Sequence, residues 1–157
     1  MLNVARFDVS KLSEARWTGN VARTLRILVG LRHEGEAAVL VHWTLAEDIR
    51  ALARGRAALG QGKPLPLALK DARAWGQKVS LFERVLPLLA DHQVAQLVEA
   101  ASICDGIVKG LKHADWPPLA WDALKRLALL AIDAQAPMGR RHLVLGALKE
   151  KSLCHFP

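Results

Sequence analysis

Cysteines and long hydrophobic runs are scarce in this sequence. Only two cysteines, Cys104 and Cys154, occur among 157 residues, which is more typical of the reducing cytosol than of a disulfide framework. No run of 18 apolar residues occurs, so no membrane-spanning helix is expected. Residues 1–17 carry charges throughout and lack the apolar segment of a secretory signal. These absences predict a cytoplasmic protein with no membrane association.

Recognisable catalytic and metal-binding motifs are also missing. The six histidines are scattered without an H-x-x-x-H pair, and the cysteines form no C-x-x-C, so no metal site is expected. No serine stands in a G-x-S-x-G turn. Cys104 falls on the apolar stripe of its expected helix, where a buried, unreactive thiol is usual. We therefore expect no enzyme activity, no cofactor and no small-molecule ligand.

A phosphate-binding loop is excluded by its spacing. Gly55 and Gly60 are five positions apart, but a P-loop requires lysine directly after the second glycine and then serine or threonine. Here Lys63 comes two positions late and is followed by Pro64. The glycines stand at the end of an apolar helical pattern, so this segment is interpreted as a helix end and a turn.

Acidic residues are outnumbered, with 15 Asp and Glu against 22 Lys and Arg, giving a net charge of +7. Such a charge indicates a polyanionic or acidic partner. The candidate contact residues are Arg16, Arg23 and Arg26 on the first two expected helices, and Arg50 and Arg54 on the third. A solvated basic face is the ordinary interpretation, and contact with a phosphate backbone or an acidic partner is the alternative.

Tyrosine is absent, whereas tryptophan occurs five times. Exposed tryptophans beside arginines could stack on nucleic-acid bases. Trp43 and Trp121, however, lie on apolar helix faces, so core packing is expected for them. Trp75 stands at the end of a short helix before a loop, where it is a candidate for an interface or helix-joint aromatic.

What is abundant is apolar sequence at helical spacing. Val39–Trp43 could form a buried strand, but Leu45, Ile49 and Leu52 continue the pattern as a helix. No segment alternates with period two. The fold class expected is therefore all-α, an antiparallel bundle of six to seven helices. The expected helices cover approximately residues 8–17, 21–34, 37–60, 66–75, 80–86, 91–112 and 119–134.

Details of these helices can be tested. Asn20 is expected to cap the second helix and Gly35 to end it, with Val21, Leu25, Leu28 and Val29 on its buried face. In residues 91–112 the apolar stripe is expected to include Val98, Val108 and Leu111. Asp105 and Lys109 are expected to form an i,i+4 pair, and Pro87 to end or kink a helix.

Three segments, in this order and spacing, carry a resemblance to a known family. They are L-R-I-L-x-G-L-R-x-E-G (Leu25 to Gly35), W-x-L-A-x-x-I-R (Trp43 to Arg50) and A-R-x-W (Ala72 to Trp75). Over residues 3–134 the sequence resembles the C-terminal part of the delta subunit of bacterial DNA polymerase III. That subunit belongs to the clamp loader of this DNA-directed DNA polymerase, a nucleotidyltransferase holoenzyme.

The resemblance implies a domain division and partners. Residues 1–18 would be the last helix of a lid domain with its linker, and residues 19–136 the helical collar domain. Residues 137–157 form a basic tail that matches no part of the family. The collar would bind the gamma/tau and delta-prime subunits and so help load the sliding clamp on DNA. The clamp itself would be contacted only by a missing N-terminal domain, and DNA contact by this region would be weak.

The sequence departs from the family at three positions and leaves a second interpretation open. Gly76 stands where a charged residue is usual, Pro87 where a helix end is usually polar, and Ala90 where a serine cap would be natural, so Asp91 is an alternative cap. The alternative function is a stand-alone basic helical nucleic-acid-binding domain.

Overall fold

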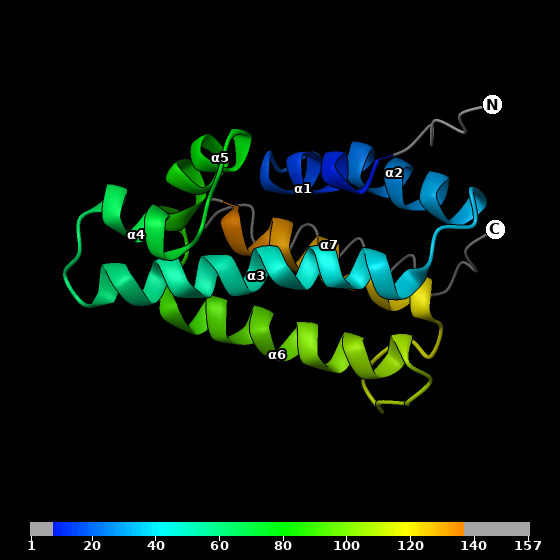
Figure 1. The fold of residues 1–157 in the computed structure, drawn as a ribbon. Helices are drawn as coiled ribbons and strands as arrows, with labels where there is room; N and C mark the ends of the chain where they lie inside the picture. Colours follow the sequence, from blue (N-terminus) through cyan, green and yellow to red (C-terminus); the bar gives the residue numbers. More distant parts are fainter. Residues whose placement is uncertain (1–7, 137–157) are drawn as a thin grey trace.

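The computed structural model describes residues 8–136, and within this range it is entirely helical (Figure 1). The all-α prediction is confirmed for this part of the chain. The expected tail 137–157 and the start of the expected lid segment lie outside the described residues. The helices are α1 (Val9–Trp17), α2 (Val21–His33), α3 (Ala38–Gly60), α4 (Leu65–Asp71), α5 (Gln77–Val85), the 3-10 helix η1 (Leu86–Leu88), α6 (Asp91–Val108) and α7 (Ala120–Gln135).

The long helix α3 is the centre of the arrangement. In Figure 1, α6 runs along one side of α3, α1 and α2 lie on the opposite side, and α4 and α5 gather at the C-terminal end of α3. α3 and α6 are antiparallel, because Arg56 near the end of α3 pairs with Asp91 at the start of α6 at 2.8 Å. His42 near the start of α3 contacts the carbonyl of Ala101 in α6 at 2.8 Å.

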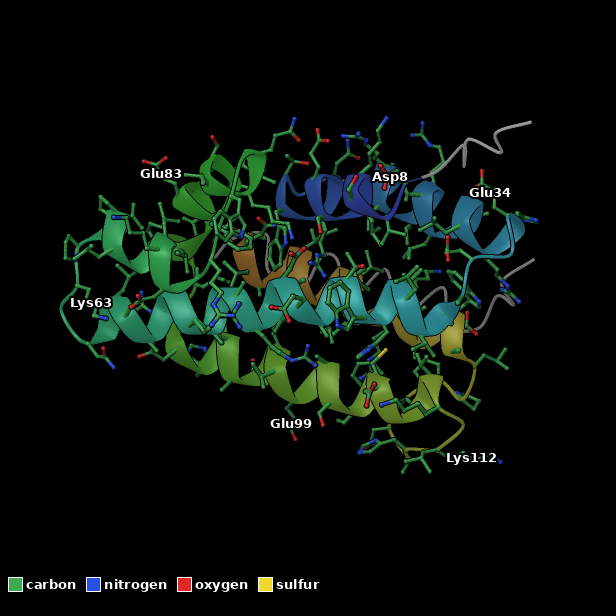
Figure 2. All side chains as sticks on the ribbon, in the orientation of Figure 1. Asp8, Glu34, Lys63, Glu83, Glu99 and Lys112 are labelled. Carbon is green, nitrogen blue, oxygen red and sulfur yellow. The ribbon has the colours of Figure 1, made fainter. Side chains whose placement is uncertain are left out.

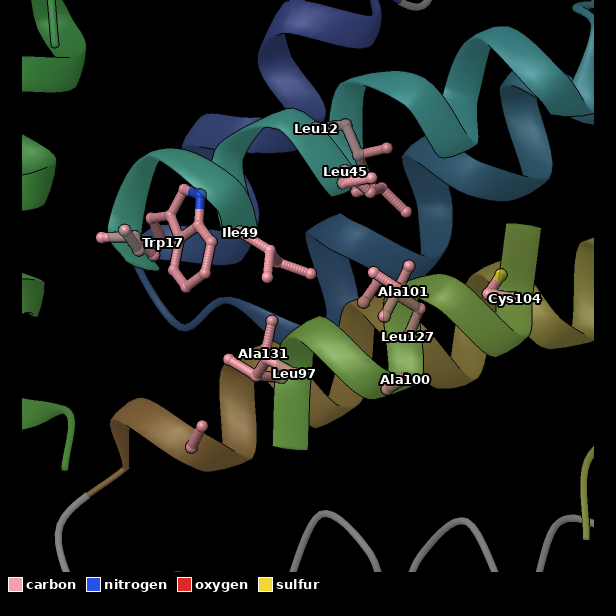
Figure 3. Close-up of a cluster of buried hydrophobic side chains, with 14 of the residues drawn as sticks. Leu12, Trp17, Leu45, Ile49, Leu97, Ala100, Ala101, Cys104, Leu127 and Ala131 are labelled. Carbon is pink, nitrogen blue, oxygen red and sulfur yellow. The ribbon is translucent and has the colours of Figure 1, made fainter. Parts of the chain in front are cut away.

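The core forms where α1, α3, α6 and α7 meet. Figure 3 shows Leu12 and Trp17 of α1 facing Leu45 and Ile49 of α3, with α6 and α7 closing the cluster. Trp17 also meets Phe82 of α5 edge to face, with ring centroids 6.3 Å apart, an arrangement that aromatic pairs favour. Small buried side chains let α6 and α7 approach closely. They are Ala100 and Ala101 on α6 and Ala123, Ala128 and Ala131 on α7.

The ends of α2 follow the sequence prediction, but its buried face is rotated. The Asn20 side chain accepts a hydrogen bond from the Arg23 backbone N–H at 3.0 Å, and Gly35 follows the helix with a φ of 77°. The prediction for the buried face is wrong in part, because only Leu28 of the four expected residues is fully buried. Val21, Leu25 and Val29 are half-buried, and Thr24, Ile27, Leu28 and Leu31 face the core.

Helices α4 and α6 end earlier than expected. α4 stops at Asp71 instead of Trp75, because the N–H groups of Arg73 and Ala74 cap its last carbonyls. α6 stops at Val108 instead of Lys112, because Gly110 adopts a φ of 97° and turns the chain. Leu111 is therefore outside the helix and 67% exposed.

The structure also resolves the remaining local predictions. Val98, expected on the buried stripe of α6, is 41% exposed. Pro87 lies in η1 directly after α5, so the prediction that it marks a helix end is confirmed. The pair between Lys109 and Asp105 forms at 2.8 Å, as predicted. At the start of α6 the Gln93 side chain accepts a hydrogen bond from the Ala90 backbone N–H, so Ala90 is the N-cap and the alternative that Asp91 caps this helix is wrong.

Candidate partner-binding surface

An exposed apolar patch lies on the first two turns of α3. Val39 is 52% exposed, Leu40 46% and Trp43 59%, and their i, i+1 and i+4 spacing puts them on one side of the helix. The prediction that Trp43 packs in the core is wrong. The helix segment around Trp43 has apolar residues on several sides, so the sequence pattern does not show which side is buried. Val41 and Leu45 are the residues that pack in the core, where they are fully buried. We call Val39, Leu40 and Trp43 the α3 apolar patch.

The same exposed side of α3 becomes charged one turn later. Glu47 pairs with Arg50 at 3.4 Å and with Arg54 at 3.2 Å. The sequence prediction named both arginines as candidate DNA or partner contacts, and both remain at the surface. Both arginines share the Glu47 carboxylate, so this part of the surface carries charges of both signs. The exposed side of α3 therefore has an apolar end and a charged end, a composition typical of protein interfaces with a polar rim.

A second basic region lies on α2. Arg26 is exposed, and Arg23 is about one-third exposed and pairs with Glu14 at 3.3 Å. Both point away from the core, as the sequence predicted. Ion pairs at such exposure contribute little to stability, so these arginines are available to an anionic partner.

Arg16 does not belong to this basic surface, and the prediction that it faces DNA or a partner is wrong. Its side chain is fully buried and forms a salt bridge of 2.8 Å with Asp48 of α3. The guanidinium also lies 4.4 Å from the centre of the Trp17 ring, within cation–π range. Arg16 is therefore a structural residue that joins α1 to α3.

Asp48 is the centre of a buried polar cluster that the sequence prediction missed. It accepts hydrogen bonds from Ser13, Trp17 and Arg16 of α1, and Lys78 of α5 reaches it at 2.7 Å. Burial favours a raised pKa, but the charge of Arg16 and the bonds from Lys78 and Ser13 outweigh it, so the pKa of Asp48 is lowered. The cluster is thus charged at neutral pH.

Arg16 is the buried cation of the same cluster. Burial lowers the pKa of Arg16 to about 10, and Asp48 opposes that shift, so the guanidinium remains protonated at neutral pH. The Gln135 side chain donates to the Arg16 carbonyl at 2.6 Å, and Arg84 donates to the Trp17 carbonyl. These bonds tie α5 and α7 to the end of α1.

One signal for the cluster was present in the sequence. Asp48 stands between Leu45 and Leu52 at helical spacing, so it falls on the core face of α3. A carboxylate on such a face requires a buried cationic partner. The partner could not be identified from spacing, because Arg16 and Asp48 are brought together by the packing of α1 against α3.

Trp75 is the most exposed large hydrophobic residue of the described range, at 76%. It lies in the connection between α4 and α5, two positions after Arg73 and directly before Gly76, which have positive φ values of 54° and 53°. Trp75 was predicted to be an interface or helix-joint aromatic; it stands at the joint between α4 and α5, and its role in an interface stays a prediction. Trp121, by contrast, is half-buried against the core, as expected.

The remaining candidate reactive groups are structural. Cys104 is buried, and desolvation with the nearby Asp105 charge raises the pKa of its thiol to about 12, so it is neutral and unreactive at neutral pH. Between residues 8 and 136 no group of three or more His, Cys, Asp or Glu side chains is placed to hold a metal ion.

Fold and surface together define a helical bundle with exposed apolar and basic faces. No helix in residues 8–136 has the length and hydropathy to cross a bilayer. Comparison with protein-family models, with curated proteins and with solved structures found no match.

Proposed function

We propose that this chain is an interaction module whose outer helix faces bind neighbouring helical domains. Specifically, we propose that it is the collar domain of a clamp-loader delta subunit and helps assemble the complex that loads the sliding clamp during DNA replication. The resemblance of three segments from Leu25 to Trp75 supports this role, and an all-helical bundle is compatible with it. The domain would act by binding and not by chemistry.

The observation that carries the proposal is the α3 apolar patch. Burying apolar surface contributes roughly 25 cal/mol per Å², yet Val39, Leu40 and Trp43 remain about half exposed. Tryptophan is among the residues that contribute most to protein interfaces. A neighbouring amphipathic helix would cover the patch, with Glu47, Arg50 and Arg54 forming a polar rim.

The proposed partners are the gamma/tau and delta-prime subunits. Contact with the sliding clamp would be made by a domain outside this chain. DNA contact would be weak and would use Arg23, Arg26 and Arg50, which are at the surface.

A reconstitution experiment tests this proposal. The chain is mixed with gamma/tau and delta-prime from the same organism, and complex formation is followed by gel filtration. We expect the wild-type chain to join the complex and a Val39→Ser/Trp43→Ser variant to be excluded from it. Leu67→Ser, at a 45% exposed position on α4, is the matched control and should join normally. A wild-type chain that binds neither subunit would refute the proposal.

The exposed arginines favour one second candidate, a basic helical domain that binds nucleic acid by itself. Arg26 is exposed and the net charge is +7. In that case log K for a DNA oligonucleotide should fall steeply and linearly with log salt concentration. Tight, sequence-selective binding would favour this candidate over the collar role, under which only weak binding is expected.

A further inference from the structure

A groove is lined by residues from the C-terminal part of α3 and from the end of α4. α4 lies at the C-terminal end of α3 (Figure 1), whereas the apolar patch is on the first turns of α3. The groove has a volume of about 460 Å³. Its polar lining residues are Arg54 of α3, Gln61 directly after α3, Lys70 and Asp71 of α4, and Arg73 directly beyond α4. We call it the α3–α4 groove. Three of these five side chains are cationic and one is anionic.

The negative groups around this groove are already satisfied. Asp71 pairs with Lys63 at 2.7 Å. The last carbonyls of α3, at Ala57 and Ala58, accept hydrogen bonds from the backbone N–H groups of Gln61 and Lys63. These contacts reduce the negative field that the end of a helix would otherwise produce.

The cations, in contrast, have bonding capacity left. Lys70 and Arg73 have no ion pair within residues 8–136, and the Nε atom of Arg54 is buried without a hydrogen-bond partner. The terminal nitrogen of Arg54 is held by Glu47 at 3.2 Å. Lys70 and Arg73 are also exposed, so their charged groups can reach an acceptor that lies in the groove.

The backbone at Arg73 is a second and independent observation. Arg73 follows the end of α4 with a φ of 54°, and it is the only residue other than glycine with positive φ in the described part of the chain. Its N–H donates to the Lys70 carbonyl, and the next N–H donates to Leu69. Glycine is the usual residue at this position of a helix end because it adopts the left-handed conformation without strain. Arg73 adopts this strained conformation, and as a result its charged side chain lies beside the groove.

We propose that the α3–α4 groove binds phosphate groups, with Arg54, Lys70 and Arg73 as the ligating side chains. Arginine recognises phosphate oxygens through paired N–H donors, and lysine acts as a point charge. The source is either a free phosphate compound or the backbone of a polynucleotide. The groove does not depend on the collar role, since a chain that joins no clamp-loader subunit can still bind phosphate here.

The test uses the full chain, and pyrophosphate is the first probe. Binding is measured by calorimetry at low salt for wild type, Arg73→Gly, Lys70→Gln and the control Lys112→Gln. Lys112 lies in the loop after α6, far from Lys63 and the groove (Figure 2). We expect Arg73→Gly and Lys70→Gln each to weaken binding about tenfold, the loss of one charge-assisted contact, and Lys112→Gln to leave it within about twofold.

The Arg73→Gly variant separates binding from folding. Removal of the left-handed strain should raise the unfolding temperature while the affinity falls, and a merely structural role would not produce opposite changes. A fluorescent single-stranded oligonucleotide forms the second arm. If the groove variants weaken the binding of the oligonucleotide and the control variant does not, the site is assigned to a polynucleotide. If the groove variants weaken only the binding of pyrophosphate, the site is assigned to a free phosphate compound. The proposal is overturned if neither probe is affected, or if Lys112→Gln weakens binding equally.

Discussion

At the scale of single residues, the most consequential group is the Asp48 carboxylate. It is 1% exposed and receives bonds from two cations, a hydroxyl and an indole. A buried ion pair adds little net stability when it is complete, but removal of one partner leaves the other charge buried and uncompensated. The cluster therefore stabilises the fold only as a whole.

Asp48→Asn should lower the free energy of unfolding by about 3–5 kcal/mol, because Arg16 keeps its charge in the core without a counter-ion. Urea denaturation followed by circular dichroism measures the change. Glu47→Gln, one position earlier at the surface, is the control and should have little effect. The double variant Arg16→Met/Asp48→Leu should recover part of the loss. Equal stability of Asp48→Asn and wild type would contradict the role of the cluster.

The same carboxylate predicts a pH dependence. Its pKa in the folded protein lies below the ordinary value of 3.8, so its contribution is complete above that value and is lost as the pH falls through the folded pKa. The stability difference between wild type and Asp48→Asn should be constant from pH 7 to about pH 5 and should shrink below about pH 4. Denaturation at a series of pH values measures it. A difference that grows toward pH 3 would have the wrong sign.

At the scale of secondary-structure elements, helix ends depend on local chemistry. The Asn20 side chain satisfies the backbone N–H of Arg23 at 3.0 Å, one of the four donors that a helix start leaves open. The polar side chain and its position are both visible in the sequence, so the start of α2 was predicted correctly. The end of α4 was not, because Arg73 adopts a conformation that sequence rules assign to glycine. The end of α6 was also placed too late, although Gly110 with its φ of 97° marks the turn there.

Asn20→Ala should cost about 1 kcal/mol, since the donor of Arg23 loses its acceptor. Asn20→Ser should restore most of the loss, because a serine hydroxyl accepts the same bond. Arg26→Gln, at an exposed position of α2, is the control and should change stability by less than about 0.5 kcal/mol. The measurement is thermal unfolding by calorimetry. If Asn20→Ala and Arg26→Gln are indistinguishable, the cap does not stabilise α2.

At the scale of the whole molecule, α3 contacts most of the other helices and still keeps one side open. Its buried side meets α1, α4, α6 and α7, and its open side carries the α3 apolar patch. One side of α3 therefore forms part of the core, and the other side forms part of the outer surface of the bundle. A partner that binds the patch would therefore contact the helix around which the bundle is built.

The isolated chain should self-associate weakly, because the α3 apolar patch of one molecule can cover that of another. Sedimentation velocity should show an apparent mass that rises with protein concentration. Trp43→Ser should reduce the rise, and Leu67→Ser should leave it unchanged. A chain that stays monomeric at high concentration would count against the patch as an interface.

The all-α class and the approximate position of each helix could be read from the sequence, because apolar spacing, the Asn20 cap and the Gly35 stop act over a few residues. The sequence also predicted the buried, inert Cys104, since that residue continues a clear apolar stripe. The burial of Arg16 and the exposure of Trp43, both against expectation, follow only from how the helices pack. In a helix that is apolar on several sides, only the positions of the neighbouring helices select the buried side. Charge pairing in the core likewise depends on which helices meet, and a contact between residues 16 and 48 has no signature in local spacing.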